Sequence, residues 1–104
     1  MVLNSDEGDI AEEYSVSRML TERTVRQGGY IWVFHKNDVD HWPSALHAHD
    51  YDKNLKLDAL TGEIYDAATK QRCGKLKTAK LEEIHGELRR SKDFTDKIVE
   101  LLGP

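Results

Sequence analysis

The chain has 104 residues, of which 38% are hydrophobic and 33% are charged, and its formal net charge at pH 7 is −4. This length fits one domain with a single hydrophobic core, and the negative charge argues against tight non-specific binding of nucleic acid by the whole molecule. No apolar run approaches the roughly 20 residues of a membrane-spanning helix, and the acidic N-terminus lacks the basic and apolar order of a secretion signal. We therefore expect a cytoplasmic protein with no membrane partner.

Charge is distributed unevenly along the chain. Residues 1–13 carry five acidic side chains and no basic one, whereas residues 70–92 carry eight lysines and arginines and three glutamates. Such a basic segment either keeps a hairpin and a helix face solvated or follows the backbone of a nucleic acid. Both interpretations stay open at this point.

The domain is expected to begin after a short tail. Residues 1–9 are polar and acidic, which predicts a disordered acidic tail. Residues 10–104 are then expected to form a single domain. Within it, residues 10–20 fit a helix or a strand equally well, because their apolar side chains match both periods.

The central part of the chain is predicted to consist of strands separated by turns. Gly28-Gly29 predicts a hairpin turn, and the β-branched and aromatic run 30–34 predicts a central strand covered on both faces. Residues 36–44 are expected to form a polar loop, because Pro43 removes a backbone donor and disfavours helix at the residue before it. Further short strands are expected at 24–27, 45–51, 54–60, 63–66 and 72–76.

The C-terminal part is predicted to be helical. Thr78 and Ser91 are each a suitable cap for a helix, and the apolar residues that follow them recur at intervals of three or four. Strands therefore come first and helices last. This order predicts an α+β fold: a small antiparallel β-sheet of 4–6 strands with two C-terminal helices packed against it.

Four of the five histidines fall within fifteen residues. Imidazole exchanges a proton or binds a metal near neutral pH without any special environment. His47 and His49 are separated by one residue on a predicted strand, so both side chains leave the same face. Such a pair can begin a divalent metal site, because neutral imidazole and carboxylate are common ligands. The third ligand is expected from the preceding loop, which offers His41, Asp38 and Asp40.

The same histidines can also serve chemistry without a metal. Cleavage of an RNA phosphodiester needs a base, an acid and a cation, and two histidines beside a lysine supply these roles. The catalytic candidates are His41, His47, His49, Asp40 and Lys36. The candidates for binding substrate are Trp42, Lys56, Arg72 and Lys75. Spacing along the chain does not distinguish the metal from the proton chemistry.

Three other residues have plainer interpretations. His35 ends a predicted strand and is expected to be solvated or hydrogen-bonded, and His85 lies on an apolar helix face, as a hydrogen-bonded core histidine does. Cys73 is the only cysteine, so no internal disulfide can form. The neighbouring Arg72 and Lys75 favour a thiolate nucleophile, but a small inert residue in a strand is the preferred interpretation.

The segment Asp40-His-Trp-Pro-Ser-Ala-Leu-His-Ala-His49 follows a short hydrophobic strand. It resembles a group of small bacterial proteins that have such a strand, an acidic-His-x-Pro-Pro-His-x-His signature, a sheet and two C-terminal helices. It also looks like the TumE-type toxin family, which carries a His-His … Pro-His-His-x-His arrangement. The match selects His41, Pro43, His47 and His49, with Asp40 as the acidic neighbour. This chain departs from the first group by placing Ser-Ala-Leu between Pro43 and His47.

Members of both groups are often encoded beside small antitoxin-like partners. The resemblance therefore implies a toxin-like protein of a toxin–antitoxin system, acting on RNA as a ribonuclease or phosphodiesterase and held by a cognate antitoxin. Two alternatives come from the residues themselves. One is a non-catalytic module, stabilised by a metal or binding a protein partner through the loop 36–44 and Trp42. The other is a regulator or antitoxin that binds nucleic acid without cutting it.

Overall fold

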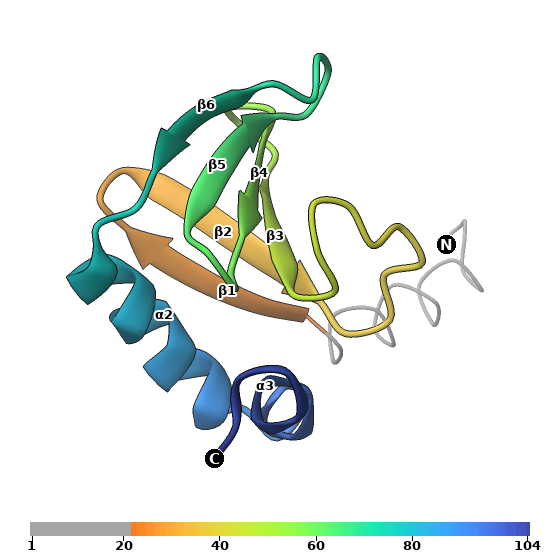
Figure 1. Ribbon diagram of the computed structural model, residues 1–104, viewed down its shortest axis with the longest axis vertical. Helices are drawn as coiled ribbons and strands as arrows, with labels where there is room; N and C mark the ends of the chain where they lie inside the picture. Colours follow the sequence, from red (N-terminus) through yellow and green to blue (C-terminus); the bar gives the residue numbers. More distant parts are fainter. Residues whose placement is uncertain (1–21) are drawn as a thin grey trace, which may run out of the picture.

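The computed structural model describes residues 22–104 and has a curved antiparallel sheet followed by two helices (Figure 1). The strands and helices are β1 (Glu22–Gln27), β2 (Tyr30–His35), β3 (His47–Asp50), β4 (Leu55–Asp58), β5 (Glu63–Asp66), β6 (Arg72–Lys75), α2 (Thr78–Arg89) and α3 (Thr95–Leu102). Each strand pairs antiparallel with the next, so the strand order in the sheet is the order in the chain. The predicted α+β fold is confirmed. The segments 1–9 and 10–20 lie outside the described residues.

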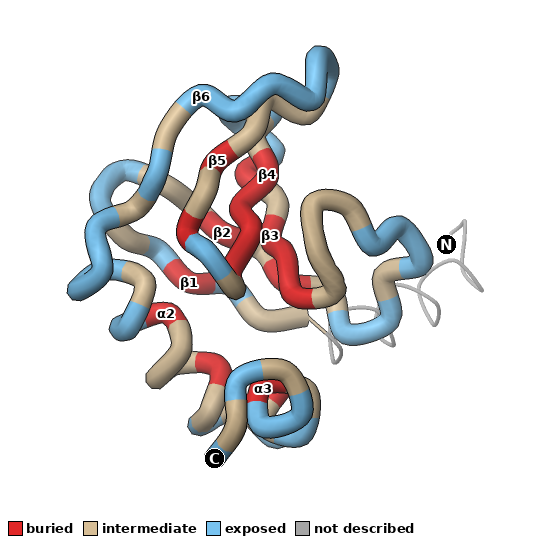
Figure 2. Tube along the Cα trace, viewed as in Figure 1, coloured by how far each residue is buried: buried red, intermediate tan, exposed pale blue. Residues whose placement is uncertain are grey.

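One face of the sheet and the inner sides of the two helices enclose the hydrophobic core (Figure 2). On β2, Trp32 and Phe34 alternate with partly exposed residues and are fully buried. On α2, Ile84 and Leu88 are four residues apart and also fully buried, as expected for one stripe of an amphipathic helix. The core therefore forms between strand residues that are buried at every second position and helix residues that are buried four positions apart.

The opposite face of the sheet is not covered in the same way. Ile31 and Val33 of β2 are partly exposed, so the expectation that this strand is buried on both faces is wrong. The reason is that no helix among residues 22–104 packs on this second face. Instead the loop between β2 and β3, residues 36–46, folds over part of it. The candidate site lies under this loop.

Neither predicted cap residue stands directly before its helix. α2 begins at Thr78 itself, after Lys77 in an extended conformation and without a side-chain cap. α3 begins at Thr95. The ring of Phe94, just before it, is buried against Phe34 with centroids 6.1 Å apart. The carbonyl of Ser91 accepts the backbone N–H groups of Phe94 and Thr95 and so closes the turn that precedes the helix. Among the residues described, neither helix is long and apolar enough to cross a membrane.

Asp50 is a buried carboxylate that joins two strands. One carboxylate oxygen accepts the backbone N–H of Ile31 at 3.1 Å, and the other accepts that of Lys53 at 3.0 Å. We expect Asp50→Ala to lower the free energy of unfolding by about 1–3 kcal/mol, because both N–H groups lose their acceptor. Urea denaturation measures this, with the exposed Asp52→Ala as the control. Equal losses in the two variants would contradict the assigned role.

Candidate metal centre

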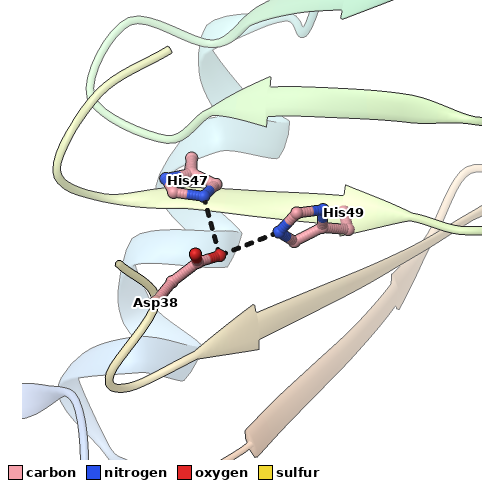
Figure 3. A group of neighbouring side chains, drawn as sticks. All are labelled: Asp38, His47 and His49. Carbon is pink, nitrogen blue, oxygen red and sulfur yellow. Dashed lines mark hydrogen bonds and ion pairs between the residues drawn. The ribbon is translucent and has the colours of Figure 1, made fainter. Parts of the chain in front are cut away.

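His47 and His49 project from the same face of β3, as their spacing predicted (Figure 3). The residue between them, Ala48, points to the core and is fully buried. The two imidazole rings have centroids 5.3 Å apart, and the Nε2 atoms lie 3.1 and 3.0 Å from one and the same oxygen, Oδ2 of Asp38. Three potential ligand atoms, two imidazole nitrogens and one carboxylate oxygen, thus lie next to one another.

Asp38 reaches the histidines because of the way the loop after β2 turns. Its second oxygen, Oδ1, accepts the backbone N–H of Asp40 at 3.0 Å, and Oδ1 of Asp40 accepts the N–H of Trp42 at 3.1 Å. Two successive turns of this kind, in which an aspartate binds the backbone two residues on, fold the loop back over the sheet. The loop conformation therefore leaves Oδ2 of Asp38 free to face β3.

Of the three loop residues that the sequence offered as a third ligand, the structure brings Asp38 to the two histidines. Among residues 22–104, the potential ligands that lie together, with ligand atoms within 4.8 Å of one another, are Asp38, His47 and His49. His41 is exposed and is not part of this group. The carboxylate of Asp40, the other predicted ligand, instead binds Nζ of Lys56 at 2.8 Å, and this ion pair lowers the pKa of Asp40. Asp38 was one of the three loop residues considered, and only the turn geometry selects it.

The hydrogen bonds of His47 determine which of its nitrogens carries a proton. Nδ1 lies 2.8 Å from the backbone carbonyl of Ser44. A carbonyl oxygen accepts only, so Nδ1 carries the hydrogen and donates it. In a neutral ring, Nε2 then holds a lone pair, which faces the carboxylate of Asp38 at 3.1 Å. Two acceptors at this distance repel, so the arrangement requires a proton or a metal cation between them.

The pKa shifts of the other two ligands favour the forms that bind metals. Burial alone would raise the pKa of Asp38, but the hydrogen bonds from His49 and from the backbone of Asp40, together with the charge of His47, lower it to about 2. Burial lowers the pKa of His49 by more than its hydrogen bond to Asp38 raises it, and His47 and Lys56 lower it further. An ionised carboxylate and a neutral imidazole are the forms that coordinate divalent ions.

Two of the distances between ligand atoms are near those of a metal site. Zinc–nitrogen and zinc–oxygen bonds of about 2.0–2.1 Å at tetrahedral angles place neighbouring ligand atoms about 3.3 Å apart. The two nitrogen–oxygen distances to Asp38 are close to this value. The side chain of His47 is only 3% exposed, whereas those of His49 and Asp38 are 16% and 20% exposed. Three protein ligands with one accessible side leave a coordination position for water or substrate.

A second group of rings surrounds His49. Tyr51 stacks on it, with centroids 5.0 Å apart and ring planes 3° apart, and the ring of His35 lies 5.3 Å from it. Nε2 of His35 and the hydroxyl of Tyr51 are hydrogen-bonded at 2.7 Å, and Nδ1 of His35 lies 3.3 Å from the carboxylate of Glu22. His35 is therefore hydrogen-bonded beside the site without being one of the three ligands. Sequence reasoning missed Tyr51, although it continues the alternation of His47 and His49.

The predicted substrate-binding residues are separated by the fold. Trp42 lies beside the site, with the ammonium groups of Lys56 and Lys70 5.1 and 5.3 Å from its ring centroid. Lys36 instead points towards Asp93, with Nζ 3.8 Å from the carboxylate, and is not among the residues that contact the three ligands.

Three other predicted residues also lie elsewhere. Arg72 pairs with Glu63 at 3.1 Å, and Lys75 is exposed on β6. Cys73 is exposed on the same strand. His85 is hydrogen-bonded as predicted, because its Nε2 lies 2.6 Å from the carbonyl of Ala59.

The site makes stability depend on pH. The carboxyl of Asp38 has a pKa of about 2 in the folded protein and about 3.9 when unfolded, so as the pH falls the unfolded chain takes up this proton first. The stabilisation, about 1–2 kcal/mol after allowance for partial exposure, is present above pH ~4 and lost towards pH ~2. The lowered pKa of His49 acts in the same direction below about pH 6.5, because the unfolded chain is protonated there first.

Asp38→Asn tests this pH dependence. In chelator-treated protein, the variant is expected to lose about 1–2 kcal/mol less than wild type between pH 4 and pH 2. Urea denaturation at a series of pH values measures the difference. Parallel curves for the two proteins would show that the carboxylate does not contribute in this way.

Comparisons with family models, with curated proteins and with solved structures found no match for this chain. The likeness to the toxin-like families therefore stays a prediction from its histidine motif.

Proposed function

We propose that this protein binds a divalent transition metal through Asp38, His47 and His49. The observation that carries the proposal is the hydrogen bond from Nδ1 of His47 to the carbonyl of Ser44. In a neutral ring this bond leaves the lone pair of Nε2 facing an ionised carboxylate, and a metal cation takes the place that a proton otherwise fills between them. A backbone carbonyl that fixes the second nitrogen of a histidine is a usual feature of metal sites.

The ligand set favours particular metals. Two imidazoles and one carboxylate suit zinc, and the same set with open positions is found in non-haem iron(II) sites. Among first-row metals the affinity of such a site rises towards copper and is high for zinc. We expect Zn²⁺ to be bound under ordinary conditions, because two imidazoles and one carboxylate are a common ligand set of zinc with an open position.

We propose further that the metal serves a toxin-like activity on RNA. A bound divalent ion supplies Lewis acidity to a phosphoryl oxygen and activates water. Two observations support RNA as the substrate class. Lys70 brings positive charge beside the site, and Trp42 offers an aromatic ring there, with the ammonium groups of Lys70 and of Lys56, which is paired with Asp40, 5.3 and 5.1 Å from its centroid. Single-stranded nucleic acids bind through this combination of cations and aromatic rings. The proposed partner is a cognate antitoxin protein.

A non-catalytic, metal-stabilised module is the second candidate. It is favoured by the fact that Asp38 belongs to the loop 36–46 whereas both histidines belong to β3. A metal between them would hold the loop on the sheet, which is a structural function in itself. This candidate predicts metal binding and stabilisation without turnover of RNA.

Elemental analysis of the purified protein tests the metal proposal. We expect about one divalent ion per chain in wild type and a small fraction of that in His47→Ala/His49→Ala. His41→Ala is the control, because His41 is exposed and outside the ligand group, and it should retain the metal. Metal-free wild-type protein that also takes up none on titration would refute the proposal.

A further inference from the structure

A cavity of about 390 Å³ lies away from the metal centre, between the β1–β2 turn, β6 and the start of α2. The side chains of Tyr30, Ile64 and Leu76, with Gly74, form its apolar part. A Cβ atom added at Gly74 would meet only Ile64, at ordinary contact distances of 3.8 and 3.9 Å. The cavity is thus an open apolar slot at the end of the core, with room for a side chain.

The slot is bordered by an edge of the sheet. β6 is the last strand in the sheet order, and no strand among residues 22–104 pairs with its outer side. The N–H of Leu76 donates to the carbonyl of Gly62 at 2.8 Å, and Lys75 is opposite Glu63. Because hydrogen-bonded pairs alternate along antiparallel strands, the N–H and carbonyl of Lys75 point away from β5 and are available to another strand.

The border of the slot is positively charged. Lys75, Lys77 and Lys80 line it, and none of them forms an ion pair with any residue that the structure describes. α2 starts beside them with Lys77 before it, with no side-chain cap and no acidic residue in its first turn. The positive end of the helix dipole adds to the charge of the three lysines.

We propose that β6 and this slot bind an extended acidic segment of a protein partner as a seventh strand. The backbone of the segment would pair with Lys75, one apolar side chain would fill the slot, and alternate carboxylates would meet the lysines. This is the usual mode of strand addition, in which the backbone provides affinity and a pocket for alternate side chains provides specificity. Charge complementarity selects an acidic partner.

A nucleic acid fits this surface less well. Its bases would need an open aromatic surface, but the one aromatic side chain that lines the cavity, Tyr30, is stacked on Trp32 with centroids 4.8 Å apart. The ammonium of Lys53 also lies 5.8 Å from the Tyr30 ring centroid. The cavity therefore offers no open aromatic face to a base, and an acidic peptide is the occupant that its apolar slot and lysines fit.

Fluorescence anisotropy with a labelled peptide of alternating glutamate and valine tests the proposal. We expect saturable binding to the full-length wild type and at least about 10-fold weaker binding to Gly74→Val, which fills the slot without changing the charge. Lys75→Pro removes the outward N–H and is expected to bind at least about 10-fold more weakly than Lys75→Ala, which keeps it. Circular dichroism confirms that each variant is folded.

The controls separate this inference from the metal proposal and from RNA binding. Lys92→Ala, an exposed lysine on the turn after α2, and His47→Ala/His49→Ala should bind the peptide as wild type does. The same amino acids with glutamates and valines in separate blocks should bind much more weakly. No binding at about 1 mM peptide, equal binding by Gly74→Val, or oligouridylate that binds here in place of the peptide would overturn the proposal.

Discussion

Excess Zn²⁺ is expected to raise the melting temperature of the wild-type protein by about 10–20 °C, and Asp38→Asn is expected to abolish most of this increase. A ligand that binds only the folded state stabilises it by about 2.7 kcal/mol at 100 times its dissociation constant. A domain of this size shifts by about 4–8 °C per kcal/mol. Asp38 supplies the single carboxylate in the group, whereas the other two ligands are imidazoles.

The substitution by asparagine is chosen to leave the loop intact. The amide oxygen of Asn can still accept the backbone N–H of Asp40, which Oδ1 of Asp38 accepts in the wild type. A lost Zn²⁺ response therefore reports the lost charge at Oδ2. Isothermal titration should give one site per chain for wild type and for His41→Ala. An undiminished thermal shift in Asp38→Asn, or none in wild type, would show that the metal is not held here.

The second prediction with a large expected effect concerns the cleavage of single-stranded RNA. We expect Zn²⁺-loaded wild type to cleave it and His47→Ala/His49→Ala to be slower by about 10³-fold or more, because the variant loses the metal that would polarise the phosphoryl oxygen and activate water. In bacteria the wild type should slow growth and the double variant should not. The assays are an RNA time course with purified protein and growth after induction.

Two controls make the RNA experiment decisive. A chelator should stop cleavage, and restored Zn²⁺ should recover it; cleavage that needs both histidines but resists chelation would support acid–base chemistry without metal. Cys73→Ser should cleave at the wild-type rate, because the thiol is exposed on β6 and is not part of the site. If metal binds, stabilises the fold and no RNA is cleaved, the non-catalytic module is the correct function.

Much of the fold is readable from periodicity. The Gly28-Gly29 turn and the C-terminal helical stripes depend on contacts between near neighbours, which the sequence itself specifies. The misjudged face of β2 is different. Its run of apolar residues cannot say whether a helix or a loop covers the second face, because this depends on where residues 36–46 go.

The residues of the candidate site also fall into two groups, those that the sequence alone placed and those that only the folded structure placed. That His47 and His49 share a face follows from the two-residue period of a strand, so the chain itself determined the pair. That Asp38 joins them, while Asp40 binds Lys56 and His41 stays exposed, was decided by the tertiary structure. Loop residues have no period, and which carboxylate reaches the sheet depends on two successive backbone turns and on a lysine that only the folded sheet brings opposite His49.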